Sequence, residues 1–264
     1  MYRQHFGITA CPLDKGSKTL FDCAQLALLK ERFQWLLDAP GLGVLTGEAG
    51  VGKTAALRQI TSPLNPHRYQ TIYTQDTDCS RRDLYSQLAL ALDLEPAYRR
   101  TQLWRDIKAR VLDLVDHRQV QPVWIIDEAQ NLPTEFFRDF PAFLNFAFDS
   151  RELMTVWLVG LPGLLHTINR VPNTALSSRI HVRVSFQPIQ DHARFRALIE
   201  QAFQAVGCQQ TLLSDSGLEM LRQASQGIPR QAGQIIKTAL RLAVPKGLNH
   251  LPDELIAEAV EVLR

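Results

Sequence analysis

The sequence has few cysteines, little net charge and no long apolar run, and each of these absences excludes a class of protein. Its four cysteines, among 264 residues, are isolated and lack the C-x-x-C spacing of metal sites and redox motifs. We therefore expect free thiols in a reducing compartment rather than a disulfide framework. The formal net charge of +2 is too small to require a nucleic-acid partner, so any such partner has to be argued from local clusters of basic residues.

No stretch of the sequence predicts a membrane span or a secretion signal. The longest near-continuous apolar run, Val156–Leu165, is interrupted by two glycines and a proline, and it falls far short of the roughly 20 residues that a spanning helix needs. The first residues, Met1-Tyr2-Arg3-Gln4-His5, contain no apolar signal core. We therefore expect a cytoplasmic protein that does not contact a membrane.

Alternating strand and helix patterns predict an α/β fold. A hydrophobic share of 45% is enough for one α/β core and a small second domain. Short apolar runs that indicate strands occur at 43–46, 71–74, 123–126, 154–159 and 180–186. Helical patterns stand between or before these runs at 24–37, from Lys53 onward, at 83–93 and at 102–117. We therefore expect a parallel five-stranded sheet with helices on both sides.

The strand patterns stop after Pro188. Helical patterns follow at 192–206, 215–225, 230–244 and 253–263, which predicts a small all-helical domain. We expect an N-terminal segment and helix over residues 1–40, an α/β core over 41–188 and a helical lid domain over 189–264.

A glycine-rich turn between a predicted strand and a predicted helix fits the phosphate-binding pattern G-x-x-x-x-G-K-[ST]. Its residues are Gly47, Glu48, Ala49, Gly50, Val51, Gly52, Lys53 and Thr54. Glycines let the backbone curl so that successive N–H groups point at phosphate oxygens, and the helix N-terminus adds its positive end. Lys53 would neutralise the β- and γ-phosphates and Thr54 would give a hydroxyl to Mg²⁺. A chance match is the alternative, and the flanking strand and helix argue against it.

An acidic pair follows the strand at 123–126. Asp127 comes directly after a buried strand, where its carboxylate can reach the Mg²⁺ shell, and Glu128 is a candidate general base for an attacking water. The adjacent glutamate argues against a small-molecule kinase, in which a separate substrate supplies the attacking group. A solvated turn is the alternative interpretation of the pair.

Two arginines complete the candidate site. Arg179 precedes the last predicted strand, where an arginine in an oligomeric ATPase reaches the γ-phosphate bound by its neighbour and spreads the transition-state charge. Arg230 opens a helix of the predicted lid, where it can contact the phosphates and couple the nucleotide state to the lid angle. The alternatives are a surface arginine and an ordinary arginine at a helix start.

Together these motifs resemble the AAA+ superfamily, with Walker A, Walker B, arginine finger and sensor 2 in the usual order. A closer resemblance, over nearly the whole chain, is to the ExeA-like ATPases, which include secretion-assembly ATPases and transposition regulators of the TnsC/TniB kind. The segments that carry it are Met1-Tyr2…Phe6-Gly7, Thr46–Thr54, Asp127–Leu132, Leu158–Gly160, Leu176–Ile180 and Gly227–Arg230. The resemblance implies binding of ATP and Mg²⁺, and ATP-dependent assembly into rings or helical filaments, which in the transposition branch surround duplex DNA.

The chain departs from this family at two places. The family often has a polar residue, called sensor 1, directly after the glycine of the fourth strand, and this chain has Leu161 there. Which residue replaces the polar side chain is left open by the sequence. The opening motif usually continues to Pro-Phe, whereas this chain has Cys11-Pro12-Leu13.

The lack of a membrane span and of a cell-wall-binding extension favours the transposition branch. We expect an ATP-dependent regulator that assembles on duplex DNA with little sequence preference and recruits or activates a transposase. A secretion-assembly or other protein-remodelling ATPase without DNA binding is the alternative. In a further alternative, ATP binding locks a scaffold and slow hydrolysis only times its release.

Clusters of basic residues give modest support for DNA. One runs from Arg99 to Arg118, another from Arg230 to Lys246, and Arg230, Gln234, Lys237 and Arg241 share one face of the predicted helix. Such clusters can bind phosphates without reading sequence, although a solvated basic face is the alternative for each. The candidate DNA contacts are Arg81, Arg82, Arg99, Arg100, Lys237 and Arg241.

Overall fold

The computed structural model describes the chain except for residues 1, 15, 17–20, 22, 209 and 264, so Met1 of the opening motif lies outside the described residues. The chain forms two compact units with separate hydrophobic cores. The sheet unit consists of Ala24–Gly47 and Ile60–Phe186. The helical unit consists of the residues up to Cys23, Glu48–Gln59 and Gln187–Arg264. The domain boundaries predicted after residues 40 and 188 stay predictions.

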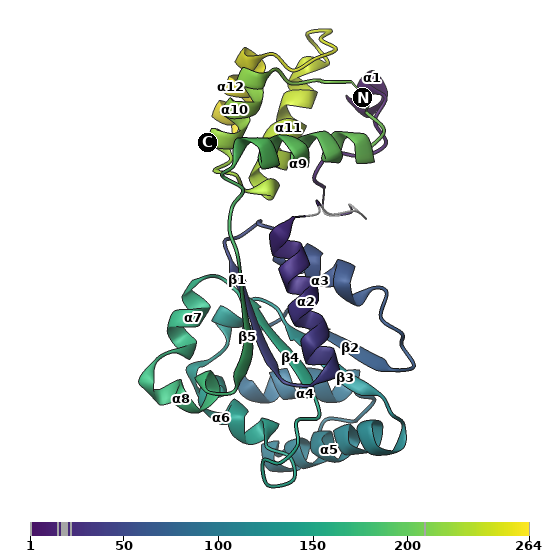
Figure 1. The fold of residues 1–264 in the computed structure, drawn as a ribbon, viewed down its shortest axis with the longest axis vertical. Coiled ribbons are helices and arrows are strands. Elements are labelled where there is room, and N and C mark those ends of the chain that lie inside the picture. Colours follow the sequence, from purple (N-terminus) through teal and green to yellow (C-terminus); the bar gives the residue numbers. More distant parts are fainter. Residues whose placement is uncertain (1, 15, 17–20, 22, 209, 264) are drawn as a thin grey trace. The chain divides into compact units, whose positions relative to one another are not determined.

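Five parallel strands form the sheet, which confirms the predicted fold class (Figure 1). They are β1 (Leu42–Gly47), β2 (Tyr69–Thr74), β3 (Gln121–Ile126), β4 (Thr155–Gly160) and β5 (Ile180–Phe186), in the order β2-β3-β4-β1-β5. The inner strands β1, β3 and β4 are buried along almost their whole length, as expected for strands covered on both faces. Their carboxyl ends meet at one edge, because Ile126 pairs with Leu158 and Thr46 pairs with Gly160.

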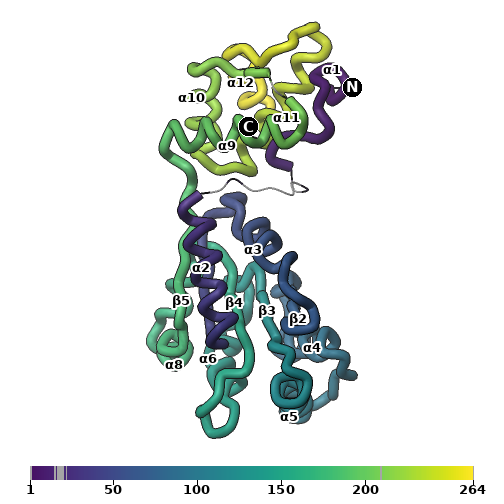
Figure 2. Tube along the Cα trace, turned by 45° about the vertical axis from the view of Figure 1, so that its right-hand side comes forward, coloured from purple at the N-terminus to yellow at the C-terminus, as the bar shows by residue number. Residues whose placement is uncertain are grey.

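Helices cover both faces of this sheet (Figure 2). On one face lies α2 (Ala24–Asp38), where Phe33 stacks on Trp157 of β4 with ring centroids 5.5 Å apart. The other face is covered by α4 (Arg81–Ala91), α5 (Arg100–Leu112) and α6 (Thr134–Leu144). A cluster of buried rings centred on Tyr85, Trp124 and Phe143 joins these helices to β3. Rings at these spacings add edge and stacking contacts to the burial of apolar area.

Some elements of the sheet unit were not predicted. Helix α6 contains Pro141 and has a stripe of four buried phenylalanines. Helix α5 continues into a π-helical turn over Asp113–His117, so the single helix predicted at 102–117 has two parts. Short helices α7 (Gly163–Ile168) and α8 (Thr174–Ser177) and 3-10 turns at Ala129–Asn131 and Val171–Asn173 complete the connections.

In the part of the helical unit that the structure describes after Phe186 there are four helices, as the sequence predicts. These are α9 (His192–Ala205), α10 (Asp215–Ala224), α11 (Pro229–Ala243) and α12 (Asp253–Val262), which enclose a core of buried aliphatic and phenylalanine side chains. The N-terminal helix α1 (Tyr2–Phe6) belongs to the same unit. Thr9 N donates to Val206 O at 2.9 Å and Ile8 is buried in this core. Among the described residues, no helix has the length and apolarity that a membrane crossing requires.

Candidate functional site

The glycine-rich loop belongs to the helical unit from Glu48 onward and leads into α3 (Lys53–Thr61). Gly50 and Gly52 have φ angles of +89° and +106°, which side-chain-bearing residues rarely adopt. A Cβ added at Gly52 would meet nothing within 4 Å, so the loop backbone is open at this point. Lys53 Nζ donates to Glu48 O at 3.1 Å, which bends the lysine back along the loop. The loop therefore has the backbone form of an anion-binding nest leading into a helix N-terminus.

Arg230 packs against this loop within the same unit. Its backbone N donates to Gly50 O at 3.3 Å, and a Cβ added at Gly50 would lie 2.7 Å from Arg230 Cβ and 3.1 Å from Ile228 Cγ2. Pro229 occupies the first turn of α11, where its missing N–H costs nothing. The start of α11 therefore brings an exposed arginine beside the glycine-rich loop, and its predicted contact with phosphates stays a prediction.

The acidic pair lies at the carboxyl end of β3 in the sheet unit. Asp127 is buried; its Oδ1 accepts from the backbone N of Glu128 at 2.9 Å, and its Oδ2 accepts from the Tyr73 hydroxyl at 2.8 Å. Glu128 has φ 52° and ψ 36°, in the left-handed region. A non-glycine residue in this region costs free energy, and such residues concentrate at functional sites.

Two side chains make further contacts with Glu128. Thr77 Oγ1 donates to Glu128 O at 2.9 Å, and Gln130 Nε2 donates to Glu128 Oε2 at 2.6 Å. Gln130 Oε1 in turn accepts from the backbone N of Leu161 at 3.0 Å. Sequence reasoning did not single out Tyr73, Thr77 or Gln130 as site residues, although Gln130 is part of the segment Asp127–Leu132 that carries the family resemblance.

Arg179 lies in the turn between α8 and β5 and is paired within its own chain. Its NH1 and NH2 atoms donate to the two carboxylate oxygens of Asp149 at 2.6 and 2.5 Å. These hydrogen bonds hold the pKa of Asp149 below its usual range. Asp149 ends a run of three left-handed residues that begins at Ala147. The structure thus groups Arg179 with Asp149, and the guanidinium remains partly exposed.

Most predicted DNA contacts of the sheet unit already have partners. Arg81 and Arg100 share the carboxylate of Asp139, and Arg82 Nε donates to Tyr98 O at 2.8 Å. Arg99 precedes α5 and is exposed. In the helical unit, Lys237 is half-buried and Arg241 is exposed on α11, and neither forms an ion pair with any residue that the structure describes.

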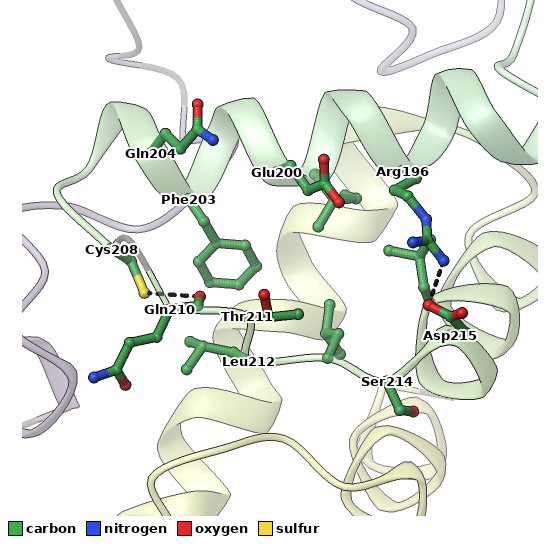
Figure 3. A pocket seen from close by; sticks show the side chains of 13 residues that line it. Arg196, Glu200, Phe203, Gln204, Cys208, Gln210, Thr211, Leu212, Ser214 and Asp215 are labelled. Carbon is green, nitrogen blue, oxygen red and sulfur yellow. Dashed lines mark hydrogen bonds and ion pairs between the residues drawn. The ribbon is translucent and has the colours of Figure 1, made fainter.

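A pocket on the helical unit involves other residues (Figure 3). It is lined by α9, by the segment around Thr211 and by the start of α10, with an ion pair between Arg196 and Asp215 at its side. The Cys208 thiol donates to Gln210 O at 3.6 Å near its other end. None of the residues predicted to bind nucleotide or DNA lines this pocket.

Comparison with known proteins adds a family and a set of related folds. The chain is 28% identical over 262 residues to General secretion pathway protein A of Aeromonas hydrophila; the match covers 95% of this chain and 46% of that protein, so the chain spans less than half of its relative. It is similar in structure to Aeropyrum pernix ORC1 in complex with DNA, with a TM-score of 0.70 and 18% identity, over 95% of this chain and 68% of that one. It is also similar to Cdc6p of Pyrobaculum aerophilum, with a TM-score of 0.64 and 18% identity, over 92% and 69%.

These structural similarities support the AAA+ P-loop fold that the motifs predicted. The family model described as "AAA domain" matches residues 37–168, which are half of the chain and include the glycine-rich loop, the acidic pair and Gln130. The chain therefore belongs to the AAA domain family.

Proposed function

We propose that the chain binds Mg·ATP at its glycine-rich loop and hydrolyses it at a site shared between neighbouring copies. The observation that carries this proposal is the presence in one chain of two preorganised elements. One is the left-handed glycine loop with Arg230 packed on it. The other is the constrained turn that presents Asp127 and Glu128 after β3. The first provides fixed N–H donors for phosphate, and the second provides carboxylates for metal and water.

Each residue has a distinct role in this proposal. The loop Gly47–Gly52 cradles the phosphates with backbone N–H groups, and Lys53 neutralises the β- and γ-oxygens. Glu128 orients the attacking water and accepts its proton. Arg179 of a neighbouring copy spreads the charge that develops on the γ-phosphoryl group, and Arg230 couples the bound phosphates to the helical unit.

The oxygen donors present fit Mg²⁺, which prefers carboxylate and hydroxyl oxygens together with substrate phosphates. Asp127 Oδ1 accepts from Glu128 N and Asp127 Oδ2 accepts from the Tyr73 hydroxyl, and these hydrogen bonds orient the carboxylate without removing its negative charge. Thr54 and Asp127 would hold the ion, which when bound neutralises phosphate charge. The Tyr73 contact orients the carboxylate from the strand next to β3.

Two substitutions test the ATP site. We expect Lys53→Ala to abolish nucleotide binding, because the phosphates lose their main cation. Glu128→Gln should bind ATP with near-normal affinity and lower kcat by about 100-fold or more, because it removes the general base. Fluorescent nucleotide titration and a phosphate-release assay measure the two effects. Near-normal turnover of Glu128→Gln would show that the base lies elsewhere.

We further propose that this activity serves a cytoplasmic regulator of transposition, of the TnsC/TniB kind, that assembles on duplex DNA and recruits or activates a transposase. Exposed basic residues on α11 and before α5 support a DNA partner. The similarity to the ORC1 protein in complex with DNA supports it at the level of the fold. An assembly with a shared ATP site would repeat these basic residues along the duplex.

One observation favours a second candidate function. General secretion pathway protein A is similar over nearly the whole of this chain, which supports a secretion-assembly ATPase that remodels protein rather than DNA. The two candidates differ in their response to duplex DNA. A DNA-dependent regulator should bind duplex DNA with an ATP analogue and not with ADP, and DNA should change its turnover. Absence of DNA binding with both nucleotides would favour the secretion candidate.

A further inference from the structure

The carboxylate of Glu128 is connected to the end of β4 by a single side chain. Gln130 donates from Nε2 to Glu128 Oε2 at 2.6 Å and accepts at Oε1 from Leu161 N at 3.0 Å. The amide can be oriented in only one way here, because a backbone N–H only donates and an ionised carboxylate only accepts. Both halves of the amide are therefore used, and the contact to the carboxylate is a short, charge-assisted hydrogen bond.

Gly160 gives Gln130 the room to make this connection. A Cβ built at Gly160 would overlap Gln130 Oε1, and it would lie 3.1 Å from Leu164 Cδ2. The tightest neighbour is thus the far end of a flexible side chain and not backbone. A methyl group at this position would move the Gln130 amide away from Leu161 N, and the strand could stay in place.

The connection is made at the end of β4 where the chain lacks a polar residue. Leu161 has an apolar side chain, so it offers polar contacts only through its backbone; its O accepts from Leu164 N at 2.9 Å, and its N donates to Gln130 Oε1. The Glu128 backbone is held separately, by Asp127 Oδ1 on its N and by Thr77 Oγ1 on its O. Of the side-chain contacts that the structure gives, the one to the Glu128 carboxylate comes from Gln130.

We propose that Gln130 is a positioning residue for the ATPase reaction, which fixes the Glu128 carboxylate relative to the end of β4 and so replaces a polar residue at position 161. This inference rests on the proposed ATPase function. The Gln130 amide is anchored on the backbone N of Leu161, which fixes the position of its Nε2 donor. A donor in one fixed position favours one rotamer of Glu128. Misplacement of a reacting group by about 1 Å can lower a rate by about 100-fold, and Gln130 would prevent such misplacement.

The first test separates positioning from folding. We expect Gln130→Ala to lower kcat by about 10- to 100-fold, with KM for ATP and affinity for a non-hydrolysable analogue within about threefold of the original, because Gln130 acts on the catalytic base and not on the nucleotide. Gln130→Glu keeps the acceptor for Leu161 N and removes the donor to Glu128. Its kcat should therefore fall by the same factor as that of Gln130→Ala. Affinity for ADP with aluminium fluoride should fall in both variants, since a transition-state mimic depends on the positioned water.

Two further variants test the geometry. Gly160→Ala should lower kcat as Gln130→Ala does, and the double variant should be no worse than either one, because both remove the same interaction. Gln70→Ala is the matched control: Gln70 Nε2 donates to Ala91 O at 2.8 Å in the same unit, and its loss should leave kcat unchanged. Thermal unfolding of each variant reports any loss of fold.

The outcomes distinguish this inference from the proposed function. If Glu128→Gln hydrolyses ATP normally, the base is wrongly assigned and Gln130 has nothing to position. If Glu128→Gln is inactive while Gln130→Ala or Gln130→Glu keeps full kcat, the ATPase assignment stands and the inference is overturned. An additive loss in the variant that combines Glu128→Gln with Gln130→Ala would also overturn it, because Gln130 would then act through another group.

Discussion

At the scale of single residues, the pairing of Arg179 with Asp149 bears on the proposed shared site. A partly exposed ion pair stabilises little, because both partners are also well solvated apart. The guanidinium can therefore exchange Asp149 for a phosphate on a neighbouring copy. We expect Arg179→Ala to lower kcat by about 1000-fold while keeping most ATP affinity, since the contact belongs mainly to the transition state.

Mixing two inactive variants tests whether the site is shared. Arg179→Ala mixed with Glu128→Gln should recover part of the turnover, because some interfaces then contain both intact residues. Arg183→Ala is the control: Arg183 lies on β5 and donates to Ser177 O and Oγ, so its loss should leave turnover near normal. Failure of every mixing ratio to recover activity would argue for a site complete within one copy.

The sequence predicted a set of candidate site residues, but it did not predict which side chains contact them. Gly50, Lys53, Asp127 and Glu128 were found because a phosphate loop and an acidic pair after a strand have fixed local spacing. Gln130 is 31 positions from Leu161 and Arg179 is 30 from Asp149, and no local spacing joins them. A side chain that is important through its partners can be identified only when the fold brings those partners together.

At the scale of elements, α10 is tied to the segment before α9 by one arginine. Arg222 donates to both oxygens of Glu219, at 2.8 and 2.5 Å, and to Gln190 O at 2.9 Å. The Arg222 hydrogen bonds, followed by one from Gln223, lower the pKa of Glu219 from 4.5 to about 2. Because the pKa is lowered in the folded state, this carboxylate stabilises the fold above pH 4.5, and the contribution is lost as the pH falls toward 2.

This gives a prediction about acid stability. Glu219→Gln should have a slightly lower Tm than the original chain at pH 7, and the difference should shrink between about pH 5 and pH 3, where the native ion pair loses its advantage. The effect is small because the group is exposed. Glu200→Gln, an exposed glutamate of α9, is the control and should leave Tm unchanged. A difference for Glu219→Gln that persists unchanged at pH 3 would contradict the assignment.

Helices and strands were predicted best where their apolar residues recur at one regular spacing without interruption. The five strands and the four C-terminal helices have clear apolar patterns, and the structure confirms them. Helix α6 was missed because Pro141, which normally interrupts a helix, stands within it. Its signal was present in the spacing of Phe136, Phe140 and Phe143, which face the same core. The contact of the N-terminal segment with the helical unit has no local signal, since it joins Thr9 to Val206.

At the scale of the whole molecule, DNA binding depends on how many basic residues an assembly presents. Arg81 and Arg100 already share Asp139, so a single copy offers only part of the predicted set of DNA contacts to a duplex. We therefore expect weak DNA binding by isolated copies and with ADP. An ATP-driven assembly would repeat the remaining predicted contacts along the phosphate backbone. Binding should then be cooperative in protein and should fall steeply with salt, because neutralised phosphates release counterions.

Paired charge reversals identify the surface that contacts the duplex. Arg99→Glu with Arg100→Glu should weaken DNA binding at least tenfold and leave DNA-free ATPase activity intact, because the residues lie outside the proposed catalytic groups. Reversal at Arg100 also leaves Asp139 facing a like charge, so Lys237→Glu with Arg241→Glu on α11 gives an independent test without a broken ion pair. Lys30→Glu with Arg68→Glu changes the net charge equally outside the two clusters and is the control.

Anisotropy titrations with an ATP analogue over a salt series measure the affinity and its slope against salt concentration. If all three pairs weaken binding equally, net charge and not a defined surface governs the contact, because a specific surface would respond only to changes within it.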